Sequence, residues 1–372
     1  MIWLGLVFMG VAYDWLTTLW LIRWLTPPGD RADRVPGEAL RSVPVTFFRP
    51  LKVGVPQIGL KLRSFFSAMQ PQDQVLIGVY DDDFITLNEA RAAAAEFPDL
   101  DLQIVPCRRD LARNPKISKL IQLVPFARWE HWMVLDSEIV NAGPFLTEFR
   151  IEWHSAQFPV FSAPYRFCQL TLTTAPVLHT LLPGLAVLIR FGKIQNTLGA
   201  AVAVTRSQIE KLGGWSELGN ELAEDYELGH RLARCSVPVQ LSRAVAVLEN
   251  DPSSPGSIYR QLHRISATYR LCQPWGFASS VVLHSVTWSL FVCHYYSFSW
   301  IILVLACASR IMVCRLRAQQ LGWQIPLARL IGFVPVSSLA ETFIWLCVWL
   351  PIPIYWSGKK WPAYRKIFPA TN

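Results

Sequence analysis

Two short motifs in the middle of this chain carry side chains that could act on a phosphorylated substrate. Asp225 follows Glu224 where a helix is predicted to begin, and a carboxylate there either caps the helix or serves as a general base for an acceptor hydroxyl. Gln261 and Arg264 lie about one helical turn apart, so both can face one site. There Arg264 could hold a departing phosphate while Gln261 orients a sugar or phosphate oxygen, or both could belong to a basic helix beside a membrane.

A second pair of carboxylates has a spacing that suits a divalent cation. Asp136 and Glu138 directly follow an apolar run at residues 131–135. At positions i and i+2 of an extended backbone, both side chains can point to the same side. A hard cation that bridges a diphosphate needs such oxygen ligands together with phosphate and water. The pattern therefore indicates a metal site, and the alternative is an exposed turn.

Further polar residues could contact a nucleotide. Asp81 and Asp83 follow the apolar run at residues 74–80, and carboxylates at the carboxyl end of a strand can accept hydrogen bonds from a nucleobase or a ribose. Asn114 and Lys116 flank a proline in a predicted turn, from which the lysine could reach a phosphate. In both cases the alternative is a solvated turn.

These residues need a scaffold, and the sequence predicts an alternating one. Short apolar runs predict buried strands, and segments with helical character, such as residues 86–97, separate them. Strands that alternate with helices imply an α/β domain with a largely parallel sheet, whose ligands bind at the carboxyl ends of the strands. The predicted strands cover residues 43–48, 74–80, 102–105 and 131–135.

Hydrophobic stretches at both ends of the chain predict an integral membrane protein. Residues 2–25 are apolar apart from Asp14 and Arg23, and a helix of that length spans a bilayer. A shorter stretch at 175–191, inside the catalytic region, is predicted to be an interfacial or re-entrant helix. Prolines in the last stretch permit a hairpin or re-entrant segment instead of one span. The C-terminal stretches cover residues 277–293, 298–313 and 331–356.

The positive charge of the protein is concentrated in this C-terminal part. The net charge is +8 at pH 7, and residues 276–372 carry eight Lys and Arg side chains against the single acid Glu341. Basic residues among apolar stretches suit anionic lipid head groups, and the sequence has no basic and aromatic module for nucleic acid. The positive-inside rule then predicts an N-terminus outside and a catalytic domain in the cytoplasm.

Taken in order, these motifs resemble glycosyltransferase family 21, the ceramide glucosyltransferases and their bacterial hopanoid-glycosylating relatives. The resemblance extends from the N-terminal anchor to Arg365. In that family three aspartates and a Gln/Arg-x-x-Arg-Trp motif define the active site, and the matching positions here are Asp81, Asp136, Asp225, Gln261 and Arg264. The other residues that carry the resemblance are Arg49-Pro50-Leu51-Lys52, Asp83, Asn114-Pro115-Lys116, Ser137 and Ala223-Glu224-Asp225-Tyr226.

The resemblance implies a GT-A domain, which is a single α/β unit that binds a nucleotide sugar. It implies that Asp136 and Glu138 hold Mn²⁺ or Mg²⁺, that Asp225 is the base, and that Arg264 and Gln261 face the leaving UDP. The nucleotide-sugar site would contain Asp81, Asp83, Lys52, Asn114 and Lys116. The implied parts are an N-terminal transmembrane anchor at 1–26, a catalytic domain at 27–275, a C-terminal membrane region at 276–358 and a basic tail at 359–372.

The implied reaction is an inverting transfer of a hexose from a UDP-sugar to the hydroxyl of a membrane lipid, either ceramide or a hopanoid. UDP-glucose is the expected donor, and UDP-N-acetylglucosamine is the second choice. The chain departs from the family at Ile265, where an aromatic residue is expected, and at Glu138, which adds a carboxylate. The alternatives are a processive polysaccharide synthase, which also uses a Gln-x-x-Arg-Trp element, and a catalytically inactive lipid-binding membrane protein.

Overall fold

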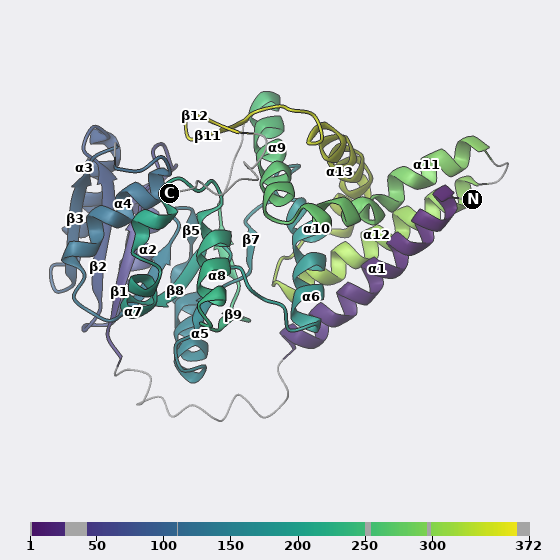
Figure 1. Ribbon diagram of the computed structural model, residues 1–372. Coiled ribbons are helices and arrows are strands. Elements are labelled where there is room, and N and C mark those ends of the chain that lie inside the picture. The colour runs from purple at the N-terminus through teal and green to yellow at the C-terminus, as the bar shows by residue number, and fades with distance from the viewer. Residues whose placement is uncertain (1, 27–42, 110, 250–253, 296–298, 363–372) are drawn as a thin grey trace. The chain divides into compact units, whose positions relative to one another are not determined.

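Figure 1 shows the computed structural model of the chain, which describes residues 2–26, 43–109, 111–249, 254–295 and 299–362. From residue 363 onward the predicted basic tail, with Arg365 and Lys366, lies outside the described residues. The chain forms two compact units. The sheet unit contains Pro27–Cys168 and Ile194–Glu249, and the membrane unit contains Met1–Thr26, Gln169–Lys193 and Asn250–Asn372.

A seven-stranded sheet in the order β3-β2-β1-β4-β8-β6-β9 forms the centre of the sheet unit. The first four strands of the chain run parallel, whereas β8 is antiparallel to β4 and β6. This arrangement confirms the predicted α/β fold with a parallel-rich sheet, and it places the carboxyl ends of β1, β2 and β4 at one edge. The strands are β1 Val45–Pro50, β2 Gln74–Tyr80, β3 Asp101–Cys107, β4 His131–Leu135, β6 Val160–Ser162, β8 Ala201–Thr205 and β9 Val239–Leu241.

Helices bury both faces of this sheet. Phe47 and Phe48 are adjacent on β1 and point to opposite faces, where they belong to two separate hydrophobic clusters. Burial on both faces explains why these strands are continuous apolar runs and not alternating ones. The helices of the sheet unit are α2 Ile58–Phe66, α3 Phe84–Ala94, α4 Pro115–Leu123, α5 Ala142–Ser155, α7 Arg206–Lys211 and α8 Glu224–Arg234. A smaller sheet contains β5 Ile139–Val140, β10 Ala246–Leu248 and β7 Tyr165–Phe167.

The predicted boundaries of these elements agree with the structure to within a few residues. The strands at 74–80 and 131–135 are found as predicted. Helix α3 begins at Phe84, earlier than the predicted residue 86, because the Asp83 carboxylate caps it and accepts a hydrogen bond from Thr86 N at 3.2 Å.

Long helices make up most of the membrane unit. Among the described residues, the three stretches long and apolar enough to cross a membrane are Ile2–Leu25, Pro274–Tyr295 and Leu327–Cys347. Their exposed apolar side chains, such as Phe8 and Phe343, are typical of lipid-facing surfaces. The helices are α1 Ile2–Leu25, η3 Val177–Leu181, α6 Leu182–Arg190, α9 Pro255–Cys272, α10 Pro274–Ser279, η5 Ser280–His284, α11 Ser285–Tyr295, α12 Trp300–Gln320 and α13 Leu327–Cys347.

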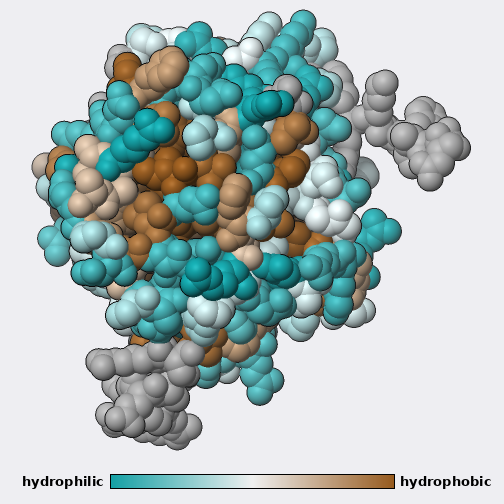
Figure 2. Space-filling model, turned by 90° about the vertical axis from the view of Figure 1, so that its left-hand side faces the viewer, coloured by the Kyte–Doolittle hydropathy of each residue, from teal (hydrophilic) through white to brown (hydrophobic). Residues whose placement is uncertain are grey.

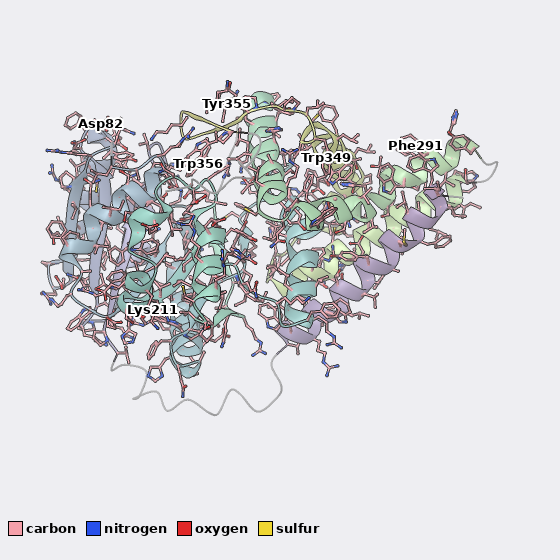
Figure 3. All side chains as sticks on the ribbon, viewed as in Figure 1. Asp82, Lys211, Phe291, Trp349, Tyr355 and Trp356 are labelled. Atoms are coloured by element: carbon pink, nitrogen blue, oxygen red, sulfur yellow. The ribbon has the colours of Figure 1, made fainter. Side chains whose placement is uncertain are left out.

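The structure shows where the helices of the C-terminal stretches begin and end. The stretch at 331–356 does not break at Pro335, since α13 continues through this residue to Cys347. A β-hairpin follows it, made of β11 Ile354–Trp356 and β12 Lys359–Trp361, and Figure 3 labels its Tyr355 and Trp356. The stretch at 298–313 belongs to α12, which is not one of the three candidate spans because it also carries Arg310, Arg315 and Arg317.

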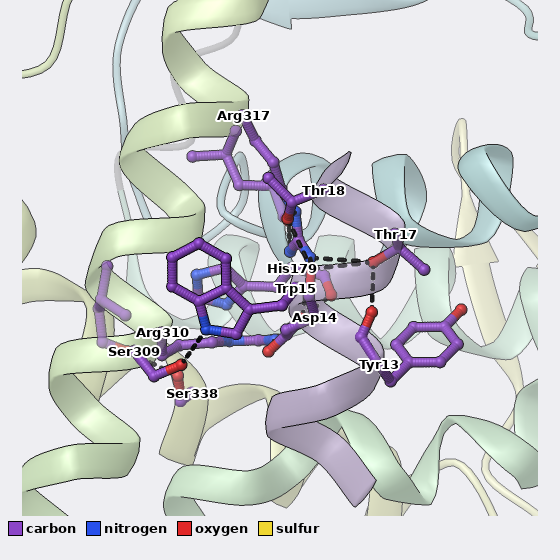
Figure 4. Close-up of polar contacts among 12 residues, drawn as sticks. Tyr13, Asp14, Trp15, Thr17, Thr18, His179, Ser309, Arg310, Arg317 and Ser338 are labelled. Atoms are coloured by element: carbon purple, nitrogen blue, oxygen red, sulfur yellow. Dashed lines mark hydrogen bonds and ion pairs between the residues drawn. The ribbon is translucent and has the colours of Figure 1, made fainter. Parts of the chain in front are cut away.

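A buried charge cluster joins α1 to α12 in the membrane unit, as Figure 4 shows. The Asp14 carboxylate pairs with the guanidinium groups of Arg310 and Arg317, and all three side chains are buried. Arg317 also donates a hydrogen bond to Leu178 O at 2.8 Å, in the π-helical turn η3 that precedes α6. The apolar helix at 177–190 therefore packs with α1 and α12 inside the membrane unit.

Figure 2 looks onto the left-hand side of Figure 1 and shows hydrophobic residues gathered within a mostly hydrophilic surface. The sheet unit exposes several large apolar side chains in the segments that follow β1 and β2, among them Val53, Leu60, Phe84 and Ile85.

Candidate active site

The candidate site lies in the sheet unit at the carboxyl ends of the parallel strands. Asp81 follows β2, Asp136 follows β4, and Asp225 lies at the start of α8. Parallel strands deliver the first two to one edge of the sheet, which is where α/β folds bind their ligands. Asp225 belongs to the same group of residues, since Lys116 interacts electrostatically with both Asp136 and Asp225.

Lys116 is the cation at the centre of this group. Its Nζ lies 2.7 Å from Asp136 Oδ1 and 3.5 Å from Glu224 Oε1, and it donates a hydrogen bond to Gly199 O at 2.9 Å. Burial by itself would lower the pKa of Lys116, but the carboxylates of Asp136 and Glu224 outweigh it and raise that pKa above its ordinary value. Lys116 is therefore charged and compensates the acidic cluster.

The pKa values of Asp136 and Glu138 shift in opposite directions because their surroundings differ. Burial, followed by repulsion from Glu138, raises the pKa of Asp136 to about 6, although Lys116 opposes the shift. Burial also acts to raise the pKa of Glu138, but Lys52 at 2.9 Å and the hydroxyl of Ser137 hold that pKa below its usual value. The two carboxylates repel each other across one loop, and a bound cation would relieve this repulsion.

This pair fits a divalent cation that shares its coordination with a substrate. Among the described residues, no group of three or more His, Cys, Asp or Glu side chains could hold a metal ion. Asp136 and Glu138 would therefore supply two of the oxygen ligands, and phosphate and water would supply the others. The hard oxygen donors suit Mg²⁺ or Mn²⁺.

Arg49 supports the loop that carries this pair, a role that the sequence did not predict. Its side chain is fully buried at the end of β1 and donates a hydrogen bond to Ile139 O at 3.0 Å, with Ser137 O 3.5 Å away. Burial lowers the pKa of Arg49 to about 10, so it stays charged beside the two carboxylates. The Arg49-Pro50-Leu51-Lys52 motif marked this segment as part of the family resemblance. The sequence could not show, however, that the Arg49 side chain is buried beneath the loop.

Asp225 occupies the first turn of α8, with its carboxylate beside the other acids. The residue before the helix, Ala223, offers no side-chain cap, and Asp225 Oδ1 accepts a hydrogen bond from Tyr226 N at 2.8 Å. Burial raises the pKa of Asp225 to about 6, and the neighbouring Glu224 adds to this shift. A carboxylate with such a pKa is a competent general base near neutral pH.

Asn114 holds the lysine and Glu224 in place. It caps α4, where its Oδ1 accepts hydrogen bonds from Lys116 N at 2.9 Å and Ile117 N at 3.2 Å. Its amide nitrogen donates to Glu221 O at 3.0 Å and to Glu224 Oε2 at 2.9 Å. The side chain is completely buried, so the protein itself satisfies its hydrogen-bonding groups.

The remaining nucleotide candidates lie at the open side of the sheet edge. Asp81 is exposed and makes no hydrogen bond or ion pair through its carboxylate with any residue that the structure describes. Next to it, Asp82, labelled in Figure 3, pairs with Arg109 at 2.7 Å. The Arg109 guanidinium lies over the ring of Tyr80 at 4.1 Å. Arg109 and Tyr80 are site neighbours that the sequence did not single out, because their pairing spans two strands.

Gln261 and Arg264 lie on α9 in the membrane unit. Both side chains are partly buried, and they lie one turn apart on a continuous helix, as their spacing predicts. The neighbouring Ile265 is also partly buried. The hairpin strand β11 packs against the same helix. Their approach to the carboxylates of the sheet unit stays a prediction.

Comparison with known proteins identifies the family and the fold of the chain. The sequence profile of "Glycosyl transferase family 21" matches residues 3–365. Among solved structures, the chain is similar to the mannosyltransferase PcManGT from Pyrobaculum calidifontis, in complex with GDP-Man and Mn²⁺, with 18% identity over 93% of this chain and 96% of that chain and a TM-score of 0.54. It is also similar to residues 1–349 of S. aureus TarS, in complex with UDP-GlcNAc, with 10% identity over 88% of this chain and 98% of that chain and a TM-score of 0.39. The predicted GT-A type of α/β fold is thereby confirmed.

Proposed function

Because this chain belongs to glycosyl transferase family 21, we propose that it moves a hexose from a UDP-sugar to the hydroxyl of a membrane lipid, ceramide or a hopanoid. The observation that supports this proposal most is the half-buried group of Asp136, Glu224 and Asp225 around Lys116. Three candidate membrane spans among the described residues would keep the enzyme beside a lipid acceptor. The basic C-terminal part supports a catalytic domain in the cytoplasm.

The transfer is an inverting displacement in this proposal. The acceptor oxygen attacks the anomeric carbon while the bond from that carbon to the UDP oxygen breaks and its electron pair leaves with UDP. Asp225 takes the proton of the acceptor hydroxyl, and a pKa of about 6 leaves it mostly deprotonated at pH 7. Arg264 and Gln261 would stabilise the leaving UDP, as preorganised donors do for developing negative charge.

The donor side of the site combines charge and hydrogen bonding. Asp136 and Glu138 would hold Mn²⁺ or Mg²⁺, which when bound neutralises charge on the diphosphate. Asp81 and Asp83 would accept hydrogen bonds from the nucleoside, and Lys52, which is largely exposed, could turn toward a phosphate. Lys116 adds a half-buried positive charge, and Asn114 contributes by fixing Lys116 and Glu224.

An acceptor panel tests this function. The purified full-length protein in detergent, given radiolabelled UDP-glucose or UDP-N-acetylglucosamine with ceramide or a hopanoid, should form a labelled glycolipid with one added sugar. A polymer would instead favour the processive polysaccharide synthase. Absence of any glycolipid together with no UDP-dependent shift in thermal unfolding would contradict the enzyme proposal and favour an inactive lipid-binding protein.

The base assignment has its own test. Asp225→Asn should lower kcat by roughly 100-fold or more, because a general base contributes about that much. UDP binding, measured by calorimetry, should stay near wild type since Asp225 faces the acceptor. Glu210→Gln, an exposed acid on α7, is the matched control. An Asp225→Asn variant with wild-type turnover would show that the base lies elsewhere.

A further inference from the structure

The segment at residues 196–200, which leads into β8, contacts the metal side of the candidate site. Ala200 O accepts a hydrogen bond from Asp136 N at 2.9 Å. Gly199 O accepts one from Lys116 Nζ, also at 2.9 Å. One end of the segment is thus fixed to the loop and to the lysine that define the acidic cluster.

The same segment lies against α8. Thr197 Oγ1 donates a hydrogen bond to the carbonyl oxygen of Asp225 at 2.6 Å. One turn further along α8, a Cβ on Gly229 would lie 2.6 Å from Asn196 Cα and from Thr197 N. Because real Cβ contacts are never this short, only glycine allows the two backbones to approach so closely.

The glycine of the segment itself, Gly199, lies against the Asp225 carboxylate. A Cβ on Gly199 would lie 2.9 Å from Asp225 Oδ2 and 3.3 Å from its Cγ. Neither Gly199 nor Gly229 has a positive φ, so alanine could adopt either backbone conformation. Glycine is therefore found at these two positions because a side chain has no room there, and not because the backbone needs the conformational freedom of glycine.

We infer that Gly199 and Gly229 are positioning residues that set where the Asp225 carboxylate stands relative to Asp136. The inference rests on the proposed function, in which Asp225 is the base. A base must lie within hydrogen-bond reach of the acceptor hydroxyl, and an error of about 1 Å in such geometry can cost about 100-fold in rate. The 196–200 segment is in contact with both carboxylate-bearing elements, so it fixes this distance.

Gly199→Ala is the sharpest test, because the added methyl group meets a side chain that can rotate away. The fold should persist, while the Asp225 carboxylate moves without losing its charge. With UDP-glucose and the lipid acceptor that gives product, kcat should fall by about 10- to 100-fold. The donor KM and the Kd for UDP should stay within about twofold, since the nucleotide side is unchanged.

A double-mutant cycle separates this role from a general structural one. If Gly199 acts through Asp225, Gly199→Ala should cause no further loss of kcat in the Asp225→Asn protein. The matched control is Gly143→Ala on α5, where an added Cβ meets only Ala68 Cβ at 3.7 Å. Its kcat should equal that of the wild type.

Gly229→Ala is a second variant that changes a different contact. Its methyl group meets backbone atoms, so α8 or the 196–200 segment must shift. Thermal unfolding in the presence of UDP shows whether this protein folds, and a folded protein should show the same loss of kcat with unchanged UDP binding.

Three outcomes would overturn the inference while leaving the proposed function intact. They are wild-type kcat in Gly199→Ala, an equal further loss when this change is added to Asp225→Asn, and a parallel loss of UDP binding. Wild-type kcat in Asp225→Asn alone would overturn the base assignment and this inference together.

Discussion

At the scale of single residues, burial decides how the carboxylates of this site are charged. Asp225 and Asp136 both have a pKa raised to about 6, first because they are buried and then because a second acid lies beside each. Lys116 adds one half-buried positive charge that offsets the acids beside it. The site therefore combines carboxylates poised near neutral pH with a fixed cation.

The raised pKa of Asp225 predicts the acid limb of the activity profile. A base works only when deprotonated, so kcat should be constant above pH 7 and fall tenfold per pH unit below about pH 6. An ordinary aspartate would keep its activity until near pH 4. The measurement is kcat with saturating donor and acceptor between pH 4.5 and 8, and an unchanged rate at pH 5 would contradict the assignment.

Lys119 predicts a pH-dependent stability. It is buried on α4, with its Nζ 3.5 Å from the ring centroid of Tyr80, and burial lowers its pKa to about 8. A lysine with a lowered pKa destabilises the folded state in full below pH 8, and the cost disappears as pH rises toward its unfolded value near 10.5. Lys119→Met should raise the stability at pH 7 by on the order of 2 kcal/mol.

The same variant has an internal control. The advantage of Lys119→Met in thermal unfolding should shrink between pH 8 and pH 10, because the wild-type lysine then loses its proton. The exposed Lys211, labelled in Figure 3, gives the matched change Lys211→Met, which should have little effect at any pH. An advantage that does not depend on pH would point to improved packing instead of charge.

At the scale of elements, residues at the end of β1 and just after it hold the loop that follows β4 in place. Arg49 fixes its backbone and Lys52 pairs with Glu138. Glu138→Gln should therefore leave the loop folded but remove one anionic ligand, and Mn²⁺ affinity in the presence of UDP should fall by about tenfold. Electron paramagnetic resonance of Mn²⁺ measures this, with Glu210→Gln as the control, and an unchanged affinity would exclude Glu138 as a ligand.

The cluster of Asp14, Arg310 and Arg317 makes α1 part of a packed unit and not only an anchor. Removing one partner leaves a buried charge unpaired, which costs about 3–5 kcal/mol. Asp14→Leu should therefore lower the thermal midpoint of the detergent-solubilised protein strongly. Replacing all three by apolar residues of similar size should cost less than the single change, and the opposite order would show that the ion pairs carry the stability.

At the scale of the whole molecule, the sequence predicted those elements whose formation depends on their own residues. The strands 74–80 and 131–135 and the helix at 2–25 follow from their own apolar residues. Contacts between distant segments could not be predicted, because period and composition do not encode them. Lys116 on Asp136, Asn114 on Glu224 and Arg49 under its loop are such contacts.

The packing partners of the apolar stretch at 175–191 were also beyond the sequence. Residues 169–193 lie in the middle of the sheet unit's sequence but belong to the membrane unit. Their apolar character was visible, yet a short apolar helix can pack in a core, lie at an interface or join other helices. The deciding contacts come from Arg310 and Arg317, more than a hundred residues away in the chain.

The pairing of Asp14 with Arg310 has a consequence for how the protein is made. The two residues are 296 positions apart, so a ribosome adding about 5–20 residues per second reaches Arg310 roughly 15–60 s after Asp14. During that interval the acid of α1 has neither arginine partner, so the buried charge cluster can form only after α12 has been synthesised.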